Sequence, residues 1–299
     1  MGKTHRKSII KLAIERFDGL MAIGDSRFEA KQTAREEAKE RGEKIWAWSD
    51  GKIRSYKTRT TYQDHTLRFI RWARETEGIK MLADLDSRAG ELVSDWLCKE
   101  TAAGQSAYTL KTERSALRMF FGDRGLAREI ALPTRKITEI KRSRGPAARD
   151  KHFQPANWQP LIQFEQSVGL RRDELTRIKV EDVMTRRGEL VAYVRNGKGG
   201  RQRYAPVIPG RETAVLAVVQ NRKPEERIFD RVPSAGDIHS YRRDYAQALY
   251  FYHAPGWPAL PPAKQRRLKP SDYNRDAAMK VSEALGHSRL DVVLRDYLR

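Results

Sequence analysis

The sequence is poor in cysteine and has no long apolar run. Its single cysteine, Cys98, excludes an internal disulfide framework and a metal site made of several thiolates, which fits a reducing compartment. No segment approaches the roughly 20 apolar residues that a membrane-spanning helix needs. The polar, charged N-terminus also lacks the apolar core of a secretory signal. We therefore expect a soluble, cytoplasmic protein with no membrane partner.

Acidic residues are outnumbered by basic ones. The 299 residues include 59 Lys and Arg but only 39 Asp and Glu, which gives a formal net charge of +20. A surface that positive attracts polyanions, and the release of counterions from phosphates favours nucleic-acid binding. Because the basic residues are spread through well-patterned segments and are not collected in a tail, nucleic acid is the expected partner.

The first half of the chain has the pattern of a helical domain. Five segments either carry an apolar face at helical spacing or, at residues 27–41, are rich in good helix formers. Ser106 is placed to cap the last of them. These segments are residues 10–21, 27–41, 61–76, 92–97 and 106–121. We predict a helical, DNA-binding domain over residues 1–140, with residues 1–55 either part of it or a separate N-terminal extension.

The second half has a mixed pattern. A basic stretch around Gly145-Pro146 has no apolar periodicity, so residues 141–152 are predicted to be a linker. Two β-rich runs at 190–194 and 204–208 flank a glycine-rich turn, which is typical of a hairpin. With helices before and after it, the domain at 153–299 is predicted to be α+β, and the whole protein mainly α with a small β-hairpin or sheet.

Four separated clusters in the second half carry groups that could do chemistry. They are Gly169-Leu-Arg171-Arg-Asp-Glu174-Leu, Lys198 at the tip of the predicted hairpin, His239-Ser-Tyr-Arg242, and Leu285-Gly-His287 followed by Tyr297. Taken alone, each is typical of a solvated surface, where such residue types usually lie. Their order along the chain is what calls for a common explanation.

In this order the clusters resemble the tyrosine recombinases, the phage integrase family. That family has an Arg in a Gly-Leu-Arg-x-x-Glu-Leu context, a hairpin Lys, His-x-x-Arg, Leu-Gly-His and a C-terminal nucleophilic Tyr. The matching residues here are Arg171, Lys198, His239, Arg242, His287 and Tyr297. The resemblance implies a helical core-binding domain and a catalytic domain that form a C-shaped clamp on double-stranded DNA, in a protein associated with the nucleoid.

The resemblance also implies a role for the cations. Arginine forks bind phosphate oxygens bidentately, which suits Arg171 and Arg242 to the charge of a pentavalent phosphorus. Lys198, on a hairpin, would protonate the leaving 5′ oxygen.

The remaining three residues would carry the nucleophilic step. A phenol with an ordinary pKa of about 10 needs help to react at neutral pH. By resemblance, His239 is its acid/base partner, His287 hydrogen-bonds the scissile phosphate, and Tyr297 forms a 3′-phosphotyrosyl link. No cofactor or metal is implied. Strand exchange would pass through a Holliday junction in a tetramer on DNA.

Three features depart from the family pattern. Tyr297 lies ten residues after His287, one more than usual. Because one residue turns a helical side chain by about 100°, we expect residues 288–294 to include a turn. The interval between His239 and His287 is about twice the usual one, because of a proline-rich, basic stretch at about 251–272 that we interpret as an inserted loop. Little of the chain follows Tyr297, so subunits would communicate through another element or exchange the Tyr-bearing segment.

Two alternatives remain open from the sequence. A non-catalytic DNA-binding regulator would explain the charge but not six reactive residues in order. A type IB topoisomerase would use the same chemistry but reseal the same strand.

Overall fold

The computed structural model of the chain describes residues 7–43, 48–136, 153–262, 268–287 and 289–299. The chain divides into two compact units, residues 1–139 and 140–299. The predicted linker at 141–152 lies outside the described residues. Within the described ranges, no helix is long and apolar enough to cross a membrane.

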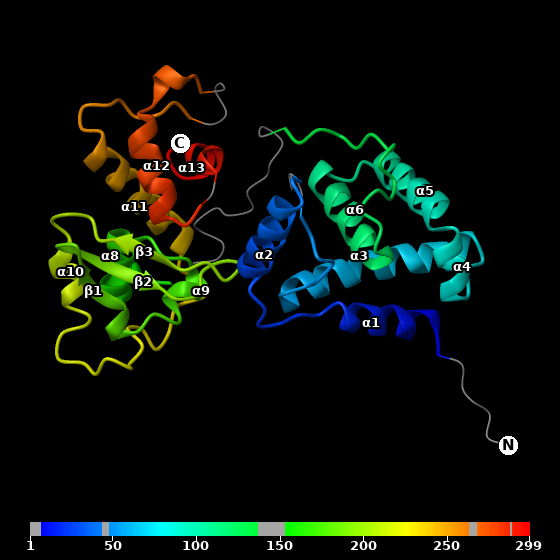
Figure 1. Ribbon diagram of the computed structural model, residues 1–299, viewed down its shortest axis with the longest axis horizontal. Helices are drawn as coiled ribbons and strands as arrows, with labels where there is room; N and C mark the ends of the chain where they lie inside the picture. The colour runs from blue at the N-terminus through cyan, green and yellow to red at the C-terminus, as the bar shows by residue number, and fades with distance from the viewer. Residues whose placement is uncertain (1–6, 44–47, 137–152, 263–267, 288) are drawn as a thin grey trace. The chain divides into compact units, whose positions relative to one another are not determined.

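The regular elements of unit 1 within the described residues are all helices (Figure 1). Each of the five predicted helical segments is confirmed, and Ser106 caps its helix by accepting a bond from the Thr109 amide. Serines cap three further helices in the same way, which satisfies amides that a helix start otherwise leaves unpaired. The helices are α1 (Ile9–Gly19), α2 (Arg27–Glu40), α3 (Tyr56–Thr76), α4 (Leu82–Ser87), α5 (Ala89–Ala102) and α6 (Ala107–Phe121).

The core of unit 1 is built around aromatic side chains. Phe69 on α3 is fully buried and packs against Trp72, Trp96 and Phe121 with ring centroids 6.0 to 6.2 Å apart. Large aromatic rings bury much apolar area and dominate the energetics of such a core. The apolar stripes of α3, α5 and α6 therefore face one another, as their spacing predicts.

Unit 2 contains a small antiparallel sheet with strand order β1-β2-β3. Its strands are β1 (Val183–Arg186), β2 (Glu189–Val194) and β3 (Arg203–Pro206). The predicted hairpin is β2 and β3, which pair with Ala192 opposite Ala205. Strand β1 adds an edge that the sequence pattern did not predict.

The helices of unit 2 cover this sheet and build a second core beside it (Figure 1). They are α8 (Gln159–Val168), α9 (Arg172–Leu175), α10 (Glu212–Leu216), α11 (Ile238–His253), α12 (Arg275–Ala284) and α13 (Leu290–Asp296), with 3₁₀ turns at Pro155–Trp158, Val180–Asp182 and Pro270–Asp272. Helix α8 packs against α11, and α12 packs against α11, α13 and β3. The predicted fold class, mainly helical with a small β-sheet, is confirmed.

The predicted insertion at about 251–272 differs in detail from a simple loop. Residues 251–253 form the last turn of α11, and a 3₁₀ turn occupies Pro270–Asp272. Between them, the described residues 254–262 and 268–269 have no helix or strand, and 263–267 lie outside the described residues.

Candidate active site

A sharp corner after α8 places the first predicted site residue. Gly169 ends α8 with φ +61°, and a Cβ there would lie 2.1 Å from the ring of Tyr245. Only glycine combines that left-handed backbone with so close an approach. The chain then buries Leu170 and presents Arg171 as the N-cap of α9, where the Arg171 amide donates to Glu174 Oε2 at 2.8 Å.

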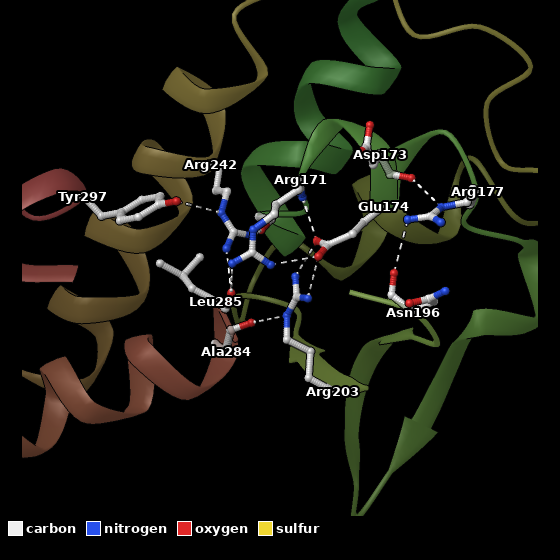
Figure 2. Close-up of polar contacts among 11 residues, drawn as sticks. Arg171, Asp173, Glu174, Arg177, Asn196, Arg203, Arg242, Ala284, Leu285 and Tyr297 are labelled. Carbon is white, nitrogen blue, oxygen red and sulfur yellow. Dashed lines mark hydrogen bonds and ion pairs between the residues drawn. The ribbon is translucent and has the colours of Figure 1, made fainter. Parts of the chain in front are cut away.

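Two arginines from different elements meet at one backbone carbonyl. Arg171 Nη2 and Arg242 Nη2, the latter on α11, donate to the Leu285 carbonyl at 3.2 and 2.6 Å (Figure 2). Arg242 also donates through Nη1 to the Gly169 carbonyl, and only 1% of the residue is exposed. Both guanidinium groups are thereby fixed in orientation, with like charges held side by side.

The predicted nucleophile lies in the same place. Tyr297 is 5% exposed, and its hydroxyl lies 3.4 Å from Arg242 Nε. The imidazoles of His239 and His287 flank the Tyr297 ring, with ring centroids 5.1 and 5.3 Å away. Five of the six predicted residues are thus brought together by α9, α11, the end of α12 and the end of α13, and Tyr297 occupies the site of its own chain.

The extra residue between His287 and Tyr297 does not rotate the tyrosine out of the site, because no continuous helix joins the two. Helix α13 begins only at Leu290 and ends at Asp296. Tyr297 is the residue after it, with φ −122° and ψ −40°, and its amide donates to the Val293 carbonyl. The helical rotation argument therefore does not apply to this interval.

His287 is held neutral and has an unused ring nitrogen. Its amide is anchored to the Ser282 carbonyl at 2.8 Å, while Nε2 is buried and has no hydrogen-bond partner among the described residues. Burial, followed by the charges of Arg171, Arg242, Arg203 and Lys198, lowers the pKa of His287 to about 4. At neutral pH, the group is therefore an uncharged imidazole aimed into a cationic site.

His239 begins α11 beside the tyrosine. The residue keeps an exposed surface, but its partial burial, followed by the charges of Arg243 and Arg242, lowers the pKa of His239. A neutral imidazole within reach of a phenol can accept a proton.

Among the described residues, Lys198 makes no hydrogen bond, ion pair or ring contact with the other five predicted site residues. It is exposed in the turn between β2 and β3. Its charge nevertheless contributes to the lowered pKa of His287, so it lies within electrostatic range of the site.

Arg203 and Glu174 form a buried ion pair at the site, and neither was assigned a role from the sequence. Arg203 on β3 donates to both carboxylate oxygens of Glu174, at 2.8 and 2.6 Å, and to the Ala284 carbonyl (Figure 2). Burial alone would raise the pKa of Glu174, but hydrogen bonds and charge from Arg203, with the charge of Arg171, lower it to about 2. The signal for Arg203 was its position two residues before Ala205, which places both side chains on the inward face of the strand, while Tyr204 between them is exposed.

Glu165 on α8 is fully buried, and neither carboxyl oxygen has a hydrogen-bond partner among the described residues. Burial raises the pKa of Glu165 well above its ordinary value, despite the nearby charge of Arg242. The site thus holds three arginines, Arg171, Arg203 and Arg242, against one firmly ionised carboxylate, Glu174. Across the described residues, no group of three or more His, Cys, Asp or Glu side chains could hold a metal ion.

A second candidate surface lies in unit 1. A pocket of about 360 Å³ between α3 and α6 is lined by Lys57, Thr58, Thr61, Tyr62, Tyr108, Lys111, Thr112, Ser115 and Arg135. Arg135 stacks over the Tyr108 ring at 4.6 Å. Cations mixed with hydroxyl donors are the groups that contact nucleic-acid phosphates.

Comparison with known families finds a match within unit 1. Residues 49–129 match the phage integrase N-terminal SAM-like domain. No curated protein sequence matches the chain.

Among the solved structures similar to this chain are two recombinases and a transposon integrase. The XerH site-specific recombinase bound to palindromic difH substrate is 16% identical with a TM-score of 0.48, covering 95% of this chain and 89% of that one. The Tn1549 transposon integrase in complex with circular intermediate DNA is 14% identical with a TM-score of 0.46, covering 90% and 94%. The XerA recombinase is 12% identical with a TM-score of 0.31, covering 97% and 94%.

These findings define a class of protein in which a helical domain of the integrase type precedes a unit of helices and strands. The match covers residues 49–129. The motifs that suggested the resemblance lie in the second half of the chain, so the match is independent of them. The predicted resemblance to the tyrosine recombinases of the phage integrase family is confirmed by this match.

Proposed function

We propose that this protein is a site-specific DNA recombinase that cleaves and rejoins double-stranded DNA through Tyr297. The observation that carries the proposal is the packing of Tyr297 among His239, His287 and Arg242, from motifs far apart in the chain. A surplus of buried positive charge around a tyrosine hydroxyl is the arrangement that a phosphodiester substrate would neutralise.

The phosphate would be held by Arg171, Arg242 and His287. Arg242 uses one N–H of each of its three nitrogens on Tyr297, Gly169 and Leu285, which leaves two of its five N–H groups for phosphate oxygens. Arg171 keeps part of its side chain exposed. His287 Nε2, without a partner among the described residues, would donate to a phosphate oxygen, and the phosphate charge would raise its pKa on binding.

The chemical step in this proposal uses these residues together with His239 and Lys198. The Tyr297 oxygen attacks phosphorus as the phenol proton passes to His239, and the bond from phosphorus to the 5′ oxygen breaks. Lys198 donates a proton to that oxygen, which leaves a 3′-phosphotyrosyl link and a free 5′ hydroxyl. Attack by a 5′ hydroxyl of a partner strand reverses the step and releases Tyr297, so bond energy is conserved. Exchange of two strand pairs in a tetramer would pass through a Holliday junction.

DNA binding would use both units. The basic, hydroxyl-rich pocket between α3 and α6 in unit 1 and the arginines of unit 2 would each meet backbone phosphates. The net charge of +20 would add a strong dependence on salt.

The test is covalent capture on a denaturing gel. Labelled duplexes from the DNA that flanks the gene, nicked one nucleotide from each candidate site so that the cleaved end is lost, are incubated with the protein and a chelator. We expect an adduct that survives denaturation with the wild type and with Tyr252→Phe, an exposed tyrosine of α11, but at least about 10³ times less with Tyr297→Phe, which lacks the nucleophile.

If the three proteins shift the same duplexes in a native gel but none forms an adduct, the proposal is wrong and the DNA-binding regulator is favoured. Equal adduct from Tyr297→Phe would remove Tyr297 from its role.

A further inference from the structure

The end of the chain is tied to the inserted segment by a pair of hydrogen bonds. Arg299 Nε donates to the Pro261 carbonyl at 2.6 Å, and Arg299 Nη2 donates to the Pro262 carbonyl at 2.8 Å. We name this contact, made by Arg299 and the carbonyls of Pro261 and Pro262, the C-terminal clasp. A planar guanidinium can reach two successive carbonyls at once, which an ammonium cannot do with the same geometry.

Apolar residues beside the clasp belong to the same buried cluster as the proposed nucleophile. Leu260, next to the two prolines, is 8% exposed and belongs to the same buried cluster as Tyr297 and Leu298. Trp257 packs against this cluster from the same segment. The inserted segment thus covers the chain on the C-terminal side of Tyr297, while α11 and His287 cover its ring.

The segment that carries Tyr297 needs such support. Helix α13 has seven residues, too few to be stable by itself in water. Tyr297 and Leu298 follow the helix, and both their amides share the single Val293 carbonyl as acceptor, at 3.1 and 3.0 Å. Few backbone bonds therefore fix the tyrosine, whose hydroxyl must be held to a fraction of an ångström for attack.

The two prolines are well suited to supply the carbonyl groups that accept hydrogen bonds from Arg299. Proline fixes φ and has no amide N–H, so a Pro-Pro pair presents its carbonyls from a stiff backbone that competes little for other bonds. We infer that the C-terminal clasp positions Tyr297 for attack, so that Arg299 is a positioning residue and the insertion is part of the active-site architecture. This inference rests on the proposed function.

The first experiment measures cleavage in single turnover. On the nicked duplex, Arg299→Ala should form the covalent adduct at least about tenfold more slowly than the wild type, while its affinity for DNA changes less than about threefold. Arg299→Lys, which keeps the charge but not the fork, should recover only part of the rate. The control is Arg295→Ala, which removes the same charge from the same segment but only an exposed pair with Asp296, and should keep the wild-type rate.

The second experiment does not depend on cleavage. Hydrogen exchange followed by mass spectrometry should show that Arg299→Ala speeds exchange in peptides covering residues 290–299, while Arg295→Ala does not. An arginine with no part in holding Tyr297 would leave this segment unchanged.

The outcomes separate the inference from the proposed function. If the wild type forms an adduct and Arg299→Ala forms it equally fast, the inference is overturned and the proposed function stands. If the wild type forms no adduct, the proposed function fails, and the exchange data then decide whether the clasp holds the segment: unchanged exchange in Arg299→Ala overturns it, and faster exchange supports it.

Discussion

At the scale of single residues, the main feature of the site is an excess of arginines over ionised carboxylates in a largely buried space. Arg242 and Glu165 are almost completely buried, and Glu174 nearly so. Burial penalises the charged form of a carboxyl group. For Glu174, the hydrogen bonds and charges of its arginine partners outweigh this penalty and lower the pKa, whereas for Glu165 burial dominates and raises the pKa. The cations are therefore in excess, which prepares the site for an anion.

The protonation of Glu165 predicts a pH dependence of stability. Its pKa in the folded protein lies above the unfolded value of about 4.3. As pH rises above that value, the unfolded chain loses the proton while the folded chain keeps it, so the contribution of Glu165 to stability falls as pH increases. Glu165→Gln has no proton to lose. The free energy of unfolding of Glu165→Gln, minus that of the wild type, should therefore increase from pH 5 to pH 8, by at most about 1.4 kcal/mol per pH unit.

Denaturant unfolding at four pH values between 5 and 8 measures this difference. Glu283→Gln, on the exposed side of α12, is the control and should differ from the wild type by a constant amount. A constant difference for Glu165→Gln as well would show that Glu165 is ionised in the folded protein.

At the scale of elements, the corner between α8 and α9 holds Arg171 in place. Gly122 and Gly169 both end a helix with positive φ, +69° and +61°. They differ in what an added Cβ would meet, because nothing lies within 4 Å of Gly122, whereas Gly169 approaches the ring of Tyr245. That ring cannot move freely, since its hydroxyl donates to the Pro206 carbonyl and the side chain is fully buried.

Paired substitutions separate backbone strain from this close contact. Gly122→Ala should cost about 1 kcal/mol from the left-handed backbone alone. Gly169→Ala should cost about 1 to 3 kcal/mol more, because the new methyl group must displace Tyr245. Urea unfolding of both variants measures the losses, and equal losses would contradict the packing described for this corner.

The sequence predicts elements well where a pattern is long. The helices of unit 1 carry apolar stripes over several turns, and the β2–β3 hairpin carries a glycine-rich turn between two β-rich runs. Strand β1, Val183–Arg186, was not predicted because four residues of mixed type give no readable alternation. The ten-residue interval from His287 to Tyr297 could not by itself place the tyrosine, because the position of Tyr297 depends on where helix α13 begins, at Leu290.

The motifs predicted which residues would lie together, five of the six in the described structure, but they did not predict the buried groups that support them. Arg203 is one of 59 basic residues, so its residue type does not single it out. Its place in the site depends on the ion pair with Glu174, which joins β3 to α9. Glu165 has the sequence context of an ordinary helix surface, and only the packing of α8 against α11 buries it. The contact of Arg299 with Pro261 and Pro262 likewise joins segments that no local pattern connects.

At the scale of the whole molecule, two separately folded units carry complementary parts of the account. Unit 1 has the integrase-type domain and a pocket rich in cations and hydroxyl groups, and unit 2 has the tyrosine in its arginine-rich site. A net charge of +20 gives the whole chain affinity for any polyanion. Charge therefore accounts for binding, and the central claim is the covalent chemistry of one residue.

The most direct test of that claim is to identify the linked residue. After reaction with a nicked duplex, nuclease and trypsin digestion should leave a nucleotide remnant on a peptide that ends at Arg299, in which Tyr297 is the only tyrosine after Arg295. The account predicts that tandem mass spectrometry finds the remnant on Tyr297, joined through a 3′ phosphate, and that the released strand bears a 5′ hydroxyl. A remnant on another residue, or a released strand with a 5′ phosphate, would contradict it.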